Sequence, residues 1–212
     1  MSDRRDFLRT TGTAAAAIAF VSAPRRAGAA PAYDDIDRFQ SGASKELLLE
    51  AINAAKMAGA SYADCRIARF RQNFVVTREQ QIINVVDTDT LGCGVRALVD
   101  GCWGFAATRD LTRAAVTGAA KEAVAIAKAN RIARDRPITL APVQAYPNAT
   151  WKSAFTTDPF EVPLEQKVDL LLKANAAAMK VNGVKFVNSI LFFVKQERQF
   201  ASTEGSVIDQ TL

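Results

Sequence analysis

The chain has 212 residues, 49% of them hydrophobic and 23% charged, and a formal net charge of +5. This composition excludes a disordered or fibrous chain and suits one or two domains with a buried core. Five arginines and two aspartates within residues 1–29 carry +3 of that charge, which leaves +2 for all other residues. Arg66, Arg69, Arg71 and Arg78 alternate with apolar residues along predicted strands instead of clustering on one face, so we expect no nucleic-acid partner.

The first segment is similar to a twin-arginine export signal. Arg4 and Arg5 are followed by Phe7 and Leu8, as such signals prefer, and then by the weakly apolar stretch Thr10–Val21. That stretch is too short and too rich in alanine for a stable membrane anchor. We therefore predict export by the twin-arginine route to the periplasm or another extracytoplasmic space, with only transient membrane contact. An ordinary amphipathic amino-terminal helix is the alternative.

Small residues mark the end of this signal. Ala27 and Ala29 lie just before Ala30, which predicts cleavage between Ala29 and Ala30. Residues 30–43 are polar and acidic, and we expect them to form a flexible lead. One domain is then predicted over residues 44–212.

The predicted domain begins with a helix. Ser44 is its expected cap, an apolar stripe runs over Leu47–Ala55, and Gly59 is expected to end it in a left-handed conformation. From Tyr62 the apolar residues alternate with a period of two, which indicates strands. With a hairpin that follows, about five consecutive antiparallel strands are expected, the first three being Ala63–Arg71, Phe74–Arg78 and Gln81–Val86.

The hairpin is the most specific local signal in the chain. Its arms are Val95–Val99 and Trp103–Ala106, and Asp100 and Gly101 between them tolerate the positive φ of a tight turn. The sequence therefore predicts a two-residue turn.

That turn has a consequence for the three cysteines. It pairs Val99 with Cys102 and Cys93 with Thr108, so Cys93 and Cys102 lie too far apart for a disulfide. We expect these two cysteines and Cys65 to be small buried residues without a reactive role.

A second helix, Leu111–Asn130, is predicted next, with Asp110 as its cap. The stretch 134–163 contains five prolines and cannot form long regular structure, so it is expected to cross the sheet. Three large aromatic residues are expected to pin it there: Trp151, Phe155 and Phe160.

The chain ends with a third helix and further strands. The helix is predicted over Leu164–Asn182, with Pro163 in its first turn and Gly183 at its end. The strand-forming stretches after it are Val184–Lys195, Glu197–Thr203 and Ser206–Leu212. The predicted fold class is α+β, an antiparallel twisted sheet with about three helices packed on it.

No set of residues in the chain predicts catalysis or a resident metal. There is no histidine, and the cysteines lack zinc-type spacing. Asp87 and Asp89 flank Thr88 in a predicted turn, where aspartate is favoured for its own backbone bonding. Gly92–Ala97 matches a dinucleotide-binding fingerprint in its letters, but it leads into a hairpin and not into a helix. We therefore expect no catalytic residue, metal ligand or cofactor in this chain.

Two arginines beside the hairpin are candidate contacts with a substrate or partner. Arg96 lies on the hairpin face opposite Val95 and Ala97, and Arg109 follows the second arm. A structural ion pair is the alternative for each.

The hairpin, the helix after it and the upstream segment GASYADCRIARFR (Gly59–Arg71) together resemble the amino-terminal domain of the TldD/PmbA family. The resemblance extends from about Lys45 to Leu212. Members of this family are metallopeptidases, some of which carry the older label of modulators of DNA gyrase. Their metal motif, H-E-x-x-x-H with a later cysteine, belongs to the carboxy-terminal half, so the chain is expected to be a fragment or a truncated product.

The resemblance implies that the complete protein is an exported zinc-dependent hydrolase active in the proteolysis of peptides. Zinc would be held in the missing carboxy-terminal half, with none in this chain. A homodimer, or a heterodimer with a related subunit, is also implied. The alternative function is a non-catalytic interaction module that pairs with a full-length paralogue.

Overall fold

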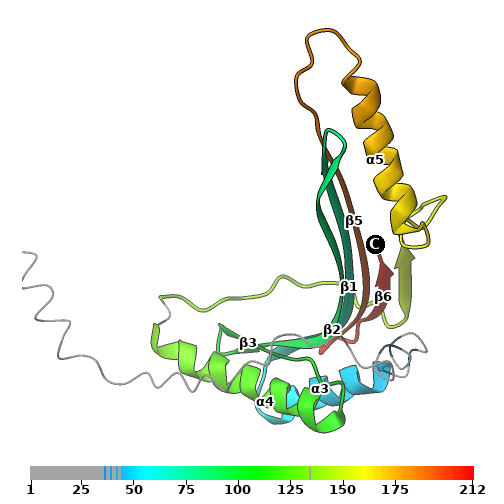
Figure 1. The fold of residues 1–212 in the computed structure, drawn as a ribbon. Helices are drawn as coiled ribbons and strands as arrows, with labels where there is room; N and C mark the ends of the chain where they lie inside the picture. The colour runs from blue at the N-terminus through cyan, green and yellow to red at the C-terminus, as the bar shows by residue number, and fades with distance from the viewer. Residues whose placement is uncertain (1–35, 37–38, 40–41, 43, 134) are drawn as a thin grey trace, which may run out of the picture.

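Residues 36, 39, 42, 44–133 and 135–212 are described by a computed structural model (Figure 1). In chain order, the elements are α3 (Lys45–Met57), β1 (Tyr62–Arg78), β2 (Gln81–Val99), β3 (Cys102–Thr108), α4 (Arg113–Ala129), the 3₁₀ turn η1 (Asn130–Ala133), β4 (Ala149–Lys152), α5 (Leu164–Ala178), β5 (Asn188–Ser202) and β6 (Val207–Thr211). The six strands form one sheet in the order β3-β2-β1-β5-β6-β4. All neighbours are antiparallel except β4, which is parallel to β6. The predicted α+β class is confirmed.

The amino-terminal half of the sheet has fewer and longer strands than predicted. The expected meander of about five strands is wrong, because β1 and β2 run unbroken for 17 and 19 residues and only β3 follows them. Asp87 and Asp89 accordingly lie inside β2 and not in a turn. The turn between β1 and β2 consists of Glu79, with a φ of 47°, and Gln80. Just after it, Ile83 is an extra residue in the β1–β2 pairing, a β-bulge that shifts the register by one.

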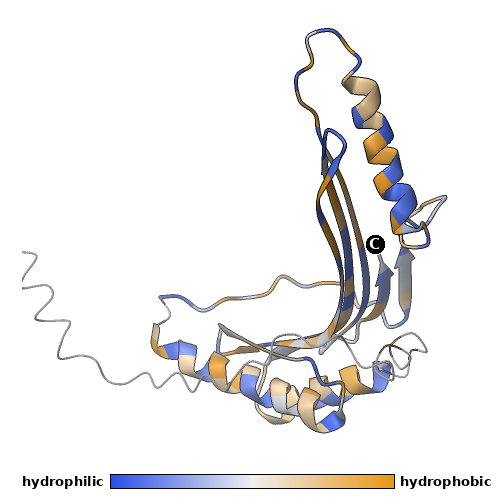
Figure 2. Ribbon diagram, in the orientation of Figure 1, coloured by the Kyte–Doolittle hydropathy of each residue, from blue (hydrophilic) through white to orange (hydrophobic). Residues whose placement is uncertain are grey.

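The long strands give the molecule two arms (Figure 1). At the base, the sheet packs on α3 and α4; in the upright arm, β1, β2 and β5 rise past the helices of the base and α5 lies beside them. One face of β1 serves both contacts, since Cys65 and Ile67 lie in the base core while Asn73 and Thr77 meet α5. Figure 2 shows the mixed hydropathy of α3 and α4, whose apolar stripes supply the helical side of that core.

Small residues let the base elements approach closely. The buried positions of α4 include Ala119, Ala120, Ala123 and Ala127. Gly104 of β3 lies against the backbone of this helix, so that a Cβ on it would be 2.0 Å from the carbonyl oxygen of Ala123. The base is therefore packed backbone to backbone at this point.

The helix ends differ from the prediction in detail. The cap of α4 is Thr112, whose Oγ1 accepts a hydrogen bond from the Ala115 amide at 3.2 Å, and not Asp110. Ser44 precedes α3 as expected, but its hydroxyl donates to Gln199 on β5 at 2.5 Å instead of capping the helix. Gly59 follows α3 with the expected positive φ of 103°. Gly183 also has a positive φ, 90°, but α5 ends earlier, at Ala178, so the prediction that Gly183 ends this helix is wrong.

The crossing segment is less tightly pinned than predicted. Trp151 lies in the edge strand β4 and Phe155 lines a hollow beside Val194 and Lys195 of β5, but both side chains remain about half exposed, at 50% and 45%. Phe160 lies under the guanidinium of Arg71, 4.5 Å from its ring centre, and Phe155 lies under the ammonium of Lys152 at 4.6 Å. Among the described helices, none has the length and apolar character required to cross a membrane.

Candidate functional site

The predicted hairpin is confirmed and positions the candidate site. Val99 pairs with Cys102, and the two turn residues Asp100 and Gly101 have φ values of 49° and 75°. This is the turn geometry that matches the twist of two antiparallel strands. Arg96, three residues before the end of β2, therefore faces away from the helices of the base.

Arg96 forms a forked ion pair with Asp64 of β1. Its Nε donates to both carboxylate oxygens at 3.1 and 2.9 Å, and its Nη2 donates to Oδ2 at 2.6 Å. Asp64 is 1% exposed, whereas the Arg96 side chain is 42% exposed. The guanidinium also lies over the ring of Trp103, 5.2 Å from its centre. A planar guanidinium held on two sides in this way keeps a fixed orientation.

A second arginine shares the same carboxylate. Arg66 lies two residues after Asp64 on the same strand face, with 3.6 Å between its Nε and Asp64 Oδ1, and its guanidinium covers the Phe200 ring at 5.6 Å. In the described part of the chain, this Nε is the one buried side-chain nitrogen or oxygen without a hydrogen-bond partner. Although its Nε is buried, the Arg66 side chain as a whole is 41% exposed.

The electrostatics follow from the buried carboxylate. Hydrogen bonding to Asp64 raises the pKa of Arg96 above its ordinary value. Burial, together with the charge of Asp64, raises the pKa of the neighbouring Tyr62 to about 12. Tyr62 therefore stays a neutral hydroxyl, and one carboxylate is left to balance two guanidinium groups.

This arrangement can bind an anion. Two half-exposed guanidinium groups, each stacked on an aromatic ring, present unused donors to solvent beside a single buried negative charge. Carboxylates are the anions that match the planar fork of arginine. Asp64, the carboxylate of the site, is already held by Arg96, and the exposed parts of the two guanidinium groups are suited to recognising an anion.

Arg109 does not belong to the Arg96 cluster, which consists of Asp64, Arg66 and Arg96. Phe105 is the residue opposite Arg96, and Arg109 follows four residues further along, about 13 Å away at 3.3 Å per residue. Its side chain is exposed and lies 4.0 Å from Asp110. Contact of Arg96 or Arg109 with a substrate or partner stays a prediction.

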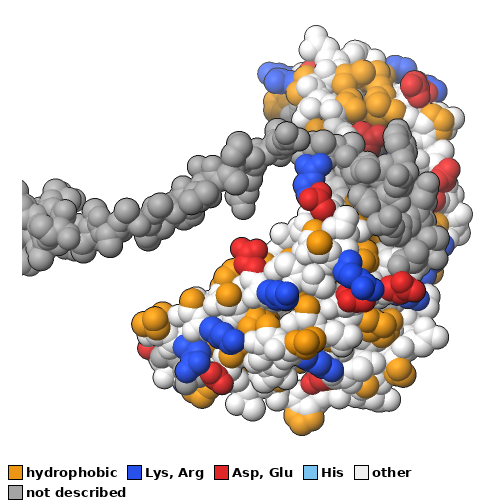
Figure 3. All heavy atoms as spheres, turned by 90° about the horizontal axis from the view of Figure 1, so that it is seen from below, with side chains coloured by type: hydrophobic (Ala, Val, Ile, Leu, Met, Phe, Trp, Pro, Cys, Tyr) orange, Lys and Arg blue, Asp and Glu red, His pale blue; other side chains and the backbone are white. Residues whose placement is uncertain are grey.

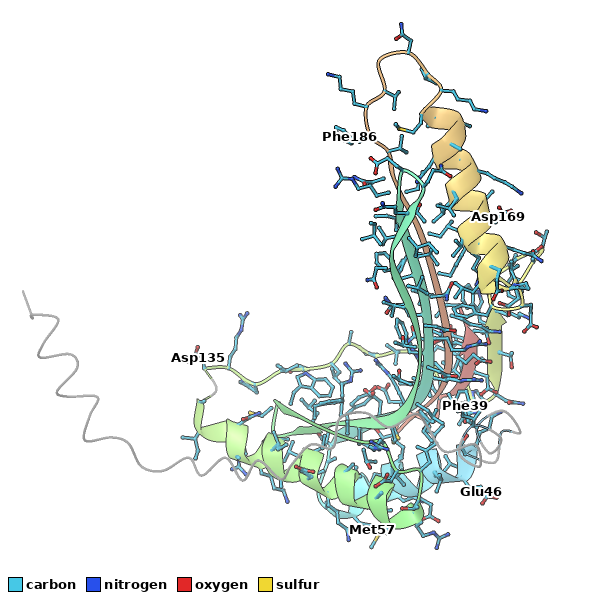
Figure 4. All side chains as sticks on the ribbon, viewed as in Figure 1. Phe39, Glu46, Met57, Asp135, Asp169 and Phe186 are labelled. Atoms are coloured by element: carbon cyan, nitrogen blue, oxygen red, sulfur yellow. The ribbon has the colours of Figure 1, made fainter. Side chains whose placement is uncertain are left out.

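A groove between α5 and β5 is a second polar feature. Lys167 of α5 is 6% exposed and donates to Asn73 Oδ1 at 3.1 Å, with the rings of Phe193 and Phe160 at 5.3 and 5.8 Å. Figure 4 shows side chains of α5, on which Asp169 is labelled, filling the space towards the sheet. The hollow beside Lys167 has a volume of about 490 Å³ and a floor of Leu191 and Phe193.

This groove continues towards the end of β6. There Lys195 donates to Asp158 at 2.6 Å, and that hydrogen bond lowers the pKa of Asp158. A second hollow lies beside Lys195 and Asp158, and Pro159 lines both this hollow and the one beside Lys167. Within the described residues, Lys167 makes no ion pair, so its charge is balanced by an amide oxygen and two ring faces alone.

The other residues predicted for function fall into two groups. The export-signal residues and the cleavage site lie outside the described residues: Arg4, Arg5, Phe7, Leu8, Ala27, Ala29 and Ala30. Asp89 is bound by Arg69 at 2.6 Å, which assigns it an ion-pair partner. Among the residues that the structure describes, no three potential ligands gather around a metal position.

Figure 3 shows basic and acidic side chains interspersed on the face seen from below the base, but the absence of a nucleic-acid partner stays a prediction.

Sequence reasoning missed Asp64 and Arg66 as neighbours of Arg96. Their spacing of two places them on one strand face, which was a readable signal. Their pairing with Arg96 depends on the bulge at Ile83, which has no clear signature in the sequence.

Comparison with known proteins gives this geometry a family context. Residues 63–127 match the sequence model of the family described as PmbA/TldA metallopeptidase domain 1. That segment contains β1 except for Tyr62, all of β2 and β3 and most of α4, and with them Asp64, Arg66 and Arg96. Among curated proteins, none matches the chain.

Three solved structures share the fold. A candidate modulator of DNA gyrase from Bacteroides thetaiotaomicron VPI-5482 has 17% identity and a TM-score of 0.58. A second candidate modulator of DNA gyrase, from Thermotoga maritima MSB8, has 14% identity and a TM-score of 0.59. TldE from Thermococcus kodakarensis has 14% identity and a TM-score of 0.54. They cover 79%, 79% and 78% of this chain, which spans only 38%, 37% and 36% of theirs.

Residues 63–127 are therefore similar to the first domain of PmbA/TldA metallopeptidases. Together with the shared fold, this similarity supports the assignment to the TldD/PmbA family that the sequence predicted.

Proposed function

We propose that this chain is the non-catalytic amino-terminal domain of an exported, zinc-dependent peptidase of the TldD/PmbA type. The observation that carries the proposal is the family match over residues 63–127, made on the same strands that hold the Arg96 cluster. In the complete protein, zinc and its ligands belong to the carboxy-terminal half, and a metal-activated water hydrolyses the peptide. Export uses the twin-arginine signal of residues 1–29.

In this scheme the domain binds and orients peptides. Arg66 and Arg96 offer two guanidinium groups to a peptide carboxylate. Residues 81–92 of β2 are not paired with β3, and this strand edge can accept an extended peptide by strand pairing. The domain also contributes to a dimer with an identical or related subunit.

The proposal is tested first on the coding DNA and then on the protein. We expect an open reading frame past Leu212 that encodes H-E-x-x-x-H, and a purified product that contains zinc and cleaves peptides. A chelator should abolish the cleavage. In that protein, replacing Arg96 with Met should raise KM for acidic peptides more than for neutral ones, whereas Arg109→Met, an exposed arginine outside the cluster, should leave both unchanged. A product with the motif but without peptidase activity would refute the proposal.

A second candidate function is an interaction module that pairs with a full-length paralogue. The long unpaired edge of β2 favours it, because Ile82, Ile83 and Val85 are 53%, 55% and 37% exposed there. A stop codon directly after Leu212, together with co-purification of a histidine-bearing family member, would select this function over the first.

A further inference from the structure

Two of the three cysteines meet in the core of the base. The sulfur atoms of Cys65 on β1 and Cys93 on β2 are 3.4 Å apart, and the residues are 0% and 2% exposed. Cys102 is also buried, but it lies at the other end of the hairpin, opposite Val99. All three are free thiols.

The β-bulge brings this pair together. With the bulge, Cys65 is opposite Val95 and Cys93 is opposite Ile67, so the cysteines are diagonal neighbours on one face. Without the extra residue Ile83, Cys65 would face Gly94, and Cys93 would point to the other side of the sheet. Diagonal neighbours have Cα atoms about 7–8 Å apart, just beyond the usual limit of about 7 Å for a disulfide. The sulfur atoms are already 3.4 Å apart, so the bond requires only a small movement of β1 relative to β2.

We propose that Cys65 and Cys93 form a site for a disulfide that joins β1 to β2 beneath α3 and α4, with Cys102 remaining a free thiol. The proposal goes beyond the proposed function and does not depend on it. Export would only bring the pair into a compartment that favours disulfides.

The oxidant is a small-molecule disulfide such as glutathione disulfide. A hydrogen bond from the Cys65 thiol lowers the pKa of Cys93, while this contact and burial raise the pKa of Cys65. The Cys93 thiolate therefore attacks a glutathione sulfur and releases one glutathione. Cys65 then loses its proton, attacks the Cys93 sulfur and releases the second. The protein loses two electrons and two protons, and glutathione disulfide is reduced to two thiols.

The test is refolding of the full chain from denaturant in a mixture of reduced and oxidised glutathione, so that burial does not block access. Trypsin separates the three cysteines into residues 57–66, 79–96 and 97–109. After alkylation of free thiols, mass spectrometry should find 57–66 joined to 79–96, with Cys102 alkylated. Oxidation should also raise Tm by roughly 5–10 °C, as expected for a loop of this size.

Oxidation in denaturant is the matched control. In the unfolded chain the nearer pair, Cys93 and Cys102, should be joined most often, because short loops close more readily than the 28-residue separation of Cys65 and Cys93. In the refolded chain, the Cys65–Cys93 cross-link should instead be about tenfold more abundant than the Cys93–Cys102 cross-link. Cys102→Ser should give the cross-link at the yield of the unmodified chain. Three alkylated thiols in the refolded chain, or a cross-link to Cys102, would overturn the proposal.

Discussion

Replacing Gly104 with alanine probes the closest contact in the base. A Cβ at this position would be 2.0 Å from the carbonyl oxygen of Ala123 and 2.4 Å from the amide nitrogen of Ala127. Both atoms belong to the backbone of α4, which cannot rotate away as a side chain can. The helix must therefore move from β3 by about 1 Å to restore ordinary contact distances.

The size of the effect follows from what that movement disturbs. A gap of 0.5–1 Å forfeits about a quarter to a half of the dispersion energy across an interface, and overpacking itself costs about 1–3 kcal/mol. The buried face of α4 includes Val116 and Val124, so we place the loss of unfolding free energy at about 3 kcal/mol. For a chain of this length, that corresponds to a decrease in Tm of roughly 6–12 °C.

The assay is thermal unfolding followed by circular dichroism. Gly118→Ala is the matched control, because Gly118 lies in α4 and a Cβ added to it would have nothing within 4 Å. Alanine is the better helix former by about 0.5–1 kcal/mol, so this variant should melt slightly higher than the unmodified chain. A Gly104→Ala variant that melts within 2 °C of the parent, roughly 1 kcal/mol at most, would refute the reasoning.

Three further changes test other parts of the account. Gly101→Val combines a φ of 75° with a Cβ 2.5 Å from Pro137. It should lower Tm more than Gly205→Val, where φ is 91° but the nearest atom, Ala145 Cβ, is at an ordinary contact distance of 3.9 Å; equal losses would exclude the clash. Arg96→Met should lower the unfolding free energy in urea by about 1–3 kcal/mol because its buried carboxylate partner loses a forked bond, whereas Arg109→Met should change it by less than about 0.5 kcal/mol. Asp158 has a lowered pKa in the folded chain, so its contribution to the unfolding free energy is present above about pH 4 and is lost as the pH falls further. The stability advantage over Asp158→Asn should therefore shrink between about pH 5 and pH 2, and a constant difference in urea midpoint would contradict this sign.

The sequence was informative where a single residue type determines the backbone. The turn at Asp100 and Gly101 was predictable because few residues accept positive φ, and the helices were predictable from their apolar spacing. The α+β class follows from that alternation of elements.

Polar residues inside strands misled the prediction. Asn73 and Asp89 suggested breaks, but Asn73 accepts a hydrogen bond from Lys167 and Asp89 pairs with Arg69. Their partners come from other elements, so local propensity could not reveal that the strands continue.

The β1–β2 register that pairs Asp64 with Arg96 could not be predicted from the sequence for a related reason. The turn at Glu79 and Gln80, continued without a bulge, places Asp64 opposite Val95. The extra residue Ile83 moves that partner to Arg96. A bulge is one inserted residue without a required side chain, and here it decides both the arginine cluster and the cysteine contact.

The central proposal is that this chain is the non-catalytic amino-terminal domain of a zinc peptidase of the TldD/PmbA type. The most direct test is to measure zinc content and peptide hydrolysis on purified residues 30–212 after dialysis. A chain without histidine, whose cysteines lack zinc-type spacing, should retain no stoichiometric zinc and cleave no peptide. One tightly bound zinc per chain, with peptide cleavage that a chelator abolishes, would contradict the account.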